Sequence, residues 1–144
     1  MIFGPQLTHL SPDAITLDDL KTLSAEQFDA LPFGAIKLDP DGVVLGYNFK
    51  EAKLARKQRD EVIGKAFFVE VAPCTDNVDF RGRLDALAKD GGGTQAFDYV
   101  FAFAWGKRSV RMRILVDPLG VWWLFVTNLD KHDLDKHDEN DDDL

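Results

Sequence analysis

Residues 97–105 read FDYVFAFAW, and an aromatic ring stands at every second position of this stretch. The rings belong to Phe97, Tyr99, Phe101, Phe103 and Trp105. Alternation with a period of two is typical of a β-strand, because successive side chains point to opposite faces of the sheet. We therefore expect one strand that turns five rings toward a single side, where they either form an ordinary core or line a binding site.

Two further strands are expected after this aromatic stretch. Apolar residues at 110, 112, 114 and 116 alternate with Arg111 and Arg113. A turn sequence at 117–120 separates them from an apolar run at 121–127. The C-terminal half of the chain therefore predicts three consecutive antiparallel strands.

The N-terminal half predicts a hairpin and several short helices. Ser24 and Gln27 have the spacing of a capping box, which begins a short helix that Pro32 ends. Strands are expected at 33–38 and 43–47, on either side of a turn sequence at 39–42. Residues 48–63 predict one or two short helices, and a longer helix begins near Asp76 and ends at the glycines from Gly91 onward. The sequence thus predicts an α+β fold, with helices packed on one face of a five-stranded antiparallel sheet.

The charge of the chain is concentrated at its C-terminal end. The net charge is −8 over 144 residues, and eight acids against two lysines at 130–144 account for −6 of it. The remainder carries 15 basic and 17 acidic residues, which excludes a basic nucleic-acid face. We expect the tail to be disordered or a frayed helix, with a metal site at His132 and His137 as the alternative.

The chain has a single cysteine and no apolar run near the roughly 20 residues that cross a bilayer. The first residues do not resemble a signal peptide, and the unpaired cysteine favours a reducing compartment. We therefore expect a cytoplasmic protein. Cys74 is either a buried structural thiol or a point of covalent chemistry. A helix beginning near Asp76 would point its N-terminal amides at the sulfur and favour the thiolate.

A thiol hydrolase is a further possibility for Cys74, but it needs a general base close to the sulfur. The histidines of the chain, His9, His132 and His137, lie near its ends and outside the predicted core elements. We therefore do not expect a thiol hydrolase, and the chain is expected not to be an enzyme.

Tyr47 and Glu51 are four residues apart at the start of a predicted helical turn, so their side chains share one side. A phenol and a protonated carboxyl placed together can both donate hydrogen bonds to one buried anion. The alternative is that Glu51 pairs with a surface lysine.

Several segments taken together closely resemble the photoactive yellow proteins, which are bacterial blue-light receptors with a PAS fold. These segments are Tyr47 with Asn48, Glu51, and the stretches 33–36, 62–65, 67–68 and 71–76, the last reading VAPCTD. The resemblance runs from about residue 29 to 127. It implies an N-terminal cap at 1–28, a PAS photosensory domain at 29–128 and an acidic tail at 129–144.

The resemblance implies that Cys74 carries p-coumaric (4-hydroxycinnamic) acid as a thioester, with the Cys74 N–H holding the thioester carbonyl. Tyr47 and a protonated Glu51 would donate to the phenolate of this chromophore. Light would isomerise the double bond from trans to cis, Glu51 would pass its proton to the phenolate, and partial unfolding would signal to an unknown downstream protein before thermal recovery. A monomer or weak dimer is expected. The alternative is a PAS module without photochemistry that binds another ligand or a protein.

The resemblance also implies which residues surround the chromophore. Lys57 would shield the pocket, and the expected lining is Ile36, Ala55, Phe67, Val71, Ala72, Thr75, Phe101, Phe103 and Trp105.

The chain departs from well-known members of the family in this lining. Ala55 replaces a supporting threonine, Lys57 an arginine, Phe103 a tyrosine, and Trp105 a methionine linked to fast recovery. We expect Ala55 and Trp105 to alter the absorption wavelength slightly and to slow the recovery after a flash.

Overall fold

The computed structural model describes residues 11–129. The expectations for His9, for a metal site at His132 and His137, and for the acidic tail at 130–144 lie outside the described residues. Within 11–129, none of the helices has the length and apolar character that crossing a bilayer requires.

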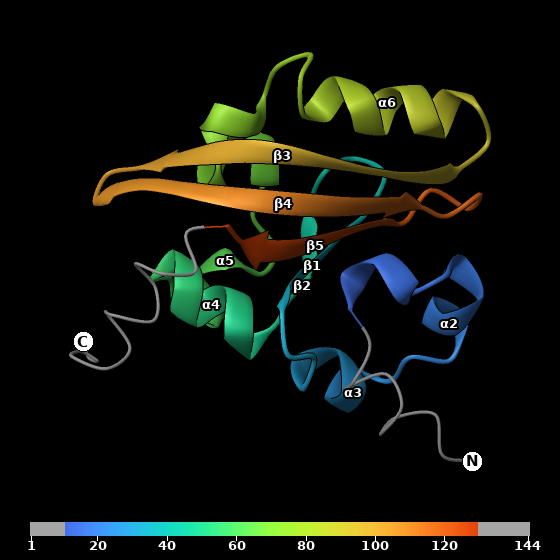
Figure 1. The fold of residues 1–144 in the computed structure, drawn as a ribbon, viewed down its shortest axis with the longest axis horizontal. Helices are drawn as coiled ribbons and strands as arrows, with labels where there is room; N and C mark the ends of the chain where they lie inside the picture. Colours follow the sequence, from blue (N-terminus) through green and yellow to red (C-terminus); the bar gives the residue numbers. More distant parts are fainter. Residues whose placement is uncertain (1–10, 130–144) are drawn as a thin grey trace.

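A five-stranded antiparallel sheet forms the centre of the molecule (Figure 1). Its strands are β1 (Gly34–Leu38), β2 (Val44–Tyr47), β3 (Gly93–Phe103), β4 (Gly106–Val116) and β5 (Trp122–Asn128). The spatial order is β2-β1-β5-β4-β3, so the first and last strands of the sequence meet near the middle of the sheet. The predicted strands and the fold class are confirmed.

The turn between β1 and β2 follows from its sequence. The Asp39 carboxylate accepts hydrogen bonds from the backbone N–H groups of Asp41 and Val43, at 2.8 and 2.9 Å. Gly42 has a φ of 85°, a conformation that glycine adopts without steric cost. The predicted hairpin is therefore held by its own turn residues.

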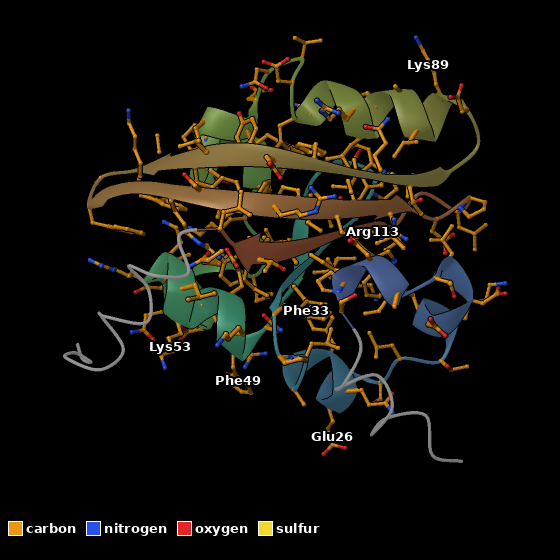
Figure 2. All side chains as sticks on the ribbon, viewed as in Figure 1. Glu26, Phe33, Phe49, Lys53, Lys89 and Arg113 are labelled. Carbon is orange, nitrogen blue, oxygen red and sulfur yellow. The ribbon has the colours of Figure 1, made fainter. Side chains whose placement is uncertain are left out.

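One face of the sheet is covered by the elements between β2 and β3. These are α4 (Phe49–Ala55), α5 (Arg59–Val62), the π-helical turn η2 (Phe67–Val71), the 3-10 turn η3 (Pro73–Thr75) and α6 (Arg81–Lys89). Buried side chains of α4, α5, η2 and α6 join one apolar core with the inward-facing residues of the strands, and Cys74 of η3 packs against this core while partly buried. Phe49 and Lys53 of α4 point away from this core, as Figure 2 shows, and Phe49 is exposed.

The opposite face is covered by the N-terminal helices η1 (Pro12–Ala14), α2 (Leu17–Lys21) and α3 (Ala25–Asp29). Leu20 and Phe28 join a second core with Trp123 and Phe125 of β5. The reciprocal capping box predicted for Ser24 is present at the start of α3. The sequence analysis expected helices on one face, whereas the N-terminal cap buries the other, and for this reason β5 is buried on both sides.

Two element boundaries differ from those predicted. The helix expected near Asp76 begins only at Arg81, and Asp76 forms an ion pair of 3.0 Å with Arg81 instead of capping the helix. Trp105 lies in the turn between β3 and β4, so β3 carries four of the five predicted rings and ends at Phe103.

Candidate functional site

A buried ion pair joins Glu51 of α4 to Arg108 of β4. Two hydrogen bonds connect them, from Arg108 Nη1 to Glu51 Oε2 at 2.8 Å and from Nη2 to Oε1 at 3.0 Å. Both side chains are almost inaccessible to solvent, with 4% of Arg108 and 2% of Glu51 exposed. A bidentate pair of this kind is the strong, planar arrangement of guanidinium and carboxylate. The prediction that Glu51 pairs with a surface lysine is wrong, because its partner is a buried arginine.

Arg108 is fixed on its other edge and on one face of the guanidinium. Its Nε donates to Asn128 Oδ1 at 2.6 Å, from the end of β5. Its guanidinium carbon lies 5.8 Å from the centre of the Phe101 ring, which faces Arg108 across the β3–β4 ladder. Sequence reasoning missed Arg108, although the alternation of β4 carries the signal: position 108 has the same parity as the buried Val110 and Met112.

The backbone around Glu51 is shaped to receive its carboxylate. A Cβ atom at Gly34 would collide with Glu51 Oε1, so only glycine leaves room for the carboxylate over β1. Asn48 caps α4 by accepting a hydrogen bond of 3.0 Å from the Glu51 N–H. Glycine at 34 and asparagine at 48 therefore place Glu51 against the sheet.

Tyr47 ends β2 one turn before Glu51, and it is 2% exposed. Burial raises the pKa of its phenol well above the usual range, the Glu51 charge raises it further, and Arg108 opposes the shift. The Tyr47 hydroxyl therefore keeps its proton near neutral pH and can donate a hydrogen bond. Arg59 fixes the residue from α5, with a bond of 2.7 Å to the Tyr47 carbonyl.

The described residues contain no hydrogen bond between Tyr47 and Glu51. The two oxygens of Glu51 instead accept from Arg108. In this structure Glu51 is thus an acceptor. That Tyr47 and a protonated Glu51 both donate hydrogen bonds to one buried anion stays a prediction.

Cys74 lies within η3 on the same side of the sheet, partly buried against the core. Its carbonyl accepts from the Tyr99 hydroxyl at 2.6 Å and from Asn77 Nδ2 at 3.0 Å. Its Sγ lies 3.5 Å from the backbone nitrogen of Ala102 on β3. Because α6 begins at Arg81, the helix N-terminus expected next to the sulfur is not there, and the predicted helix field on the thiol is wrong.

The contacts of β3 connect the cysteine to the ion pair. Ala102, which meets the Cys74 sulfur, follows Phe101, whose ring faces the guanidinium that binds Glu51. Cys74 and Tyr47 also belong to one apolar cluster. The thiol, the phenol and the carboxylate therefore share one core region, which the predicted lining residues also reach. Of these, the buried ones are Ile36, Ala55, Phe67, Val71, Ala72, Thr75 and Phe101.

Trp105 covers the end of α4. Its ring stacks on Phe103 with centroids 5.2 Å apart and planes 12° apart, and the guanidinium carbon of Arg56 lies over the Trp105 ring, 4.1 Å from its centroid. Its Nε1 donates to the Ala55 carbonyl at 3.3 Å. Trp105 is 39% exposed, so it is a cover on the core and not part of its interior.

Lys57 follows α4 and stands at the surface near the same cover. Its Nζ lies 5.6 Å from the centre of the Phe103 ring. It also lines an open pocket with Val62 and Val71, two buried residues of the core, and with Glu61, Lys65 and Glu70. The role of Lys57 as a gate of the site stays a prediction.

Two other kinds of chemistry find no support in residues 11–129. That part of the chain contains no histidine, so it offers no imidazole base for a thiol hydrolase at Cys74. It also contains no group of three or more His, Cys, Asp or Glu side chains that could hold a metal ion.

Comparisons with known proteins agree on the fold. Residues 24–120 match the model of the PAS fold family. The chain is 37% identical over 114 residues to the photoactive yellow protein of Rhodothalassium salexigens, covering 76% of this chain and 91% of the relative. It is 36% identical over 126 residues to that of Halochromatium salexigens, covering 85% and 98%.

A solved structure is similar over the same region. The photoactive yellow protein domain of the sensor histidine kinase Ppr from Rhodospirillum centenum superposes with a TM-score of 0.70 at 36% identity. The match covers 76% of this chain and 97% of that domain.

Proposed function

The chain belongs to the photoactive yellow protein family of PAS-fold photoreceptors, a sensory and non-enzymatic family, and on this premise we propose that Cys74 carries p-coumaric acid as a thioester. The observation that supports it most is the gathering of Cys74, Tyr47 and Glu51 on one side of the sheet, within one connected core region. The site suits a phenolate, because a buried phenol, a buried acid and a guanidinium lie together at the start of α4.

Attachment requires an activated ester of p-coumaric acid. The Cys74 sulfur forms a bond to the acyl carbon, the ester's alcohol or thiol leaves, and the leaving group takes the thiol proton. Tyr99 and Asn77 hold the Cys74 carbonyl and thereby fix the backbone from which the sulfur projects. The Cys74 N–H is proposed to donate to the thioester carbonyl.

At the other end of the site, Tyr47 is proposed to donate its hydroxyl proton in a hydrogen bond to the phenolate oxygen. A free phenol ionises near pH ~10, so a buried phenolate needs such donors to replace its hydration. When bound, the chromophore supplies absorption of blue light and the trans-to-cis isomerisation. With the chromophore bound, a protonated Glu51 would transfer the proton of its carboxyl to the phenolate oxygen, and loosened contacts around α4 would constitute the signal before thermal recovery.

The experiment that tests this proposal is reconstitution of the apoprotein with an activated p-coumaroyl ester. We expect blue absorption that bleaches under light and recovers in the dark, and we expect the Cys74→Ser protein to form no coloured adduct. Because serine is nearly isosteric with cysteine, the variant keeps the fold and removes only the thiol.

If the wild-type protein forms no adduct, or an adduct that light does not change, the chain is instead a PAS module for another ligand or a protein partner. A downstream signalling protein, a cytoplasmic location and a monomeric or weakly dimeric state complete the proposal. The single cysteine of the chain is compatible with a reducing compartment.

A further inference from the structure

We propose that Arg108 is the internal counter-ion of Glu51, so that Glu51 can lose its proton without leaving an unpaired charge in the core. Arg108 is then a positioning residue of the photocycle that limits the structural change following proton transfer. This inference rests on the proposed function for its place in the photocycle. The ion pair itself can be tested in the protein without a chromophore.

The geometry carries the first step of the argument. Both oxygens of Glu51 are engaged by the two Nη atoms of Arg108, and Asn128 holds the Nε on the remaining edge. The guanidinium thus donates three hydrogen bonds, to Glu51 of α4 and Asn128 of β5, and has almost no contact with solvent. An arginine held this firmly needs no rearrangement to receive a carboxylate.

The second step is the charge of the cluster. Arg108 forms the ion pair with Glu51, and the phenol of Tyr47, which burial keeps neutral, is close enough for the charges of both residues to act on it. When the chromophore is bound, one proton is shared between its phenolate and Glu51. The cluster of phenolate, Glu51, Tyr47 and Arg108 then contains one anion and one cation. Moving the proton from Glu51 to the phenolate changes which group is the anion, and the net charge stays zero.

The third step is the energetic consequence. An unpaired carboxylate in a protein core is costly because it loses its hydration, and that cost would favour opening of the structure around it. Arg108 removes most of this driving force, because the pair formed after proton transfer is the one observed here. We therefore expect a smaller light-induced opening than the one implied for a Glu51 that lacks a cationic partner.

Infrared spectroscopy of the protein before chromophore attachment tests the ion pair. The Glu51→Gln protein serves to identify the Glu51 band by difference. We expect the band of an ionised carboxylate in the wild-type protein and the band of a protonated carboxyl in Arg108→Met. A protonated carboxyl in the wild type, or an unchanged band in Arg108→Met, would overturn the proposal.

Hydrogen exchange of the illuminated, chromophore-loaded protein tests the consequence. We expect the amides of α4 to exchange at least about tenfold faster in Arg108→Met than in the wild type. The matched control is Arg111→Met, which removes an exposed arginine of the same strand that pairs with Asp98 at 3.2 Å. Equal exchange in wild type and Arg108→Met, or equal acceleration in Arg111→Met, would contradict a specific role for Arg108.

Two further comparisons keep the result interpretable. If Arg108→Met does not fold, Arg108→Lys retains the cation without the planar fork, and the inference requires Glu51 to remain ionised there. A wild-type protein that takes up no chromophore refutes the proposed function, whereas the infrared measurement still decides whether Arg108 neutralises Glu51.

Discussion

Trp105 closes the core near the end of α4 by contacts of three kinds. It stacks on Phe103, lies beneath the guanidinium of Arg56 and donates a hydrogen bond to the carbonyl of Ala55. The last of these satisfies a carbonyl in the final turn of a helix, where intrahelical donors run out. A flexible methionine would offer neither the planar stack nor the donor.

We expect Trp105→Met to recover faster after a flash than the wild-type protein, by about tenfold. The reason is that loss of the stack and the hydrogen bond loosens the β3–β4 turn over the site, at a cost of about 1–2 kcal/mol. Flash photolysis of the two reconstituted proteins measures the rates. Trp105→Phe, which keeps a ring for stacking, should fall between them. Recovery at the same rate in Trp105→Met and the wild type would refute this explanation of slow recovery.

The sequence predicts some residues of the site and not others. Cys74, Tyr47 and Glu51 follow from the motif around them, but the motif does not include the partner of Glu51. The parity of β4 would place Arg108 in the core, since Arg108 is two positions before Val110. Asn128 and Gly34 could not be predicted as parts of the site, because they reach it only through the β1–β5 and β4–β5 pairings of the sheet.

At the scale of elements, Asn48 connects three segments that the sequence separates. Its Oδ1 accepts from the N–H of Ala35 at 2.9 Å and of Glu51 at 3.0 Å. Its Nδ2 donates to the carbonyls of Phe28 and Phe33 at 3.3 and 2.9 Å. The side chain is fully buried, so it joins the end of α3, the start of β1 and the start of α4 within the protein interior.

We expect Asn48→Ala to lower the free energy of unfolding by about 3 kcal/mol, because the substitution leaves buried backbone donors and acceptors unpaired. Ser24→Ala is the matched control, since it removes a cap hydrogen bond of 3.1 Å in an exposed setting and should cost about 1 kcal/mol. Urea unfolding followed by tryptophan fluorescence measures both. Similar losses of unfolding free energy in the two variants would mean that burial does not increase the contribution of the Asn48 hydrogen bonds to stability.

The elements themselves were largely predictable, and the exceptions have local causes. Capping residues and turn residues act within a few positions, so α3 and the β1–β2 hairpin could be expected from them. The start of α6 could not be predicted. Asp76 is of a residue type that often caps helices, but here it pairs with Arg81, and Asn77 accepts a hydrogen bond from the Phe80 N–H just before the helix. Both Asp76 and Asn77 could accept from the first N–H groups of a helix, and the sequence alone does not show which one does.

The sheet separates two cores. α4, α5 and α6 bury one core with the candidate site, and α2 and α3 bury the other on the opposite face of the sheet. Arg113 of β4 reaches the second layer, where its Nη2 donates to the Ile15 carbonyl at 3.3 Å. Strand alternation predicted that Arg113 faces away from the first core, but it could not tell that the N-terminal segment would cover it.

The ion pair between Glu51 and Arg108 joins residues 57 positions apart in the sequence. Closing so long a loop costs chain entropy, and contacts of this kind tend to form after local ones during folding. We expect Glu51→Gln to accelerate unfolding while changing the folding rate by less than about twofold. Stopped-flow folding and unfolding rates over a range of urea concentrations measure both effects. A folding rate that falls in proportion to stability would instead place the pair in the folding nucleus. On the expected result, the contribution of the pair is to lengthen the lifetime of the folded site, with little effect on how quickly that site forms.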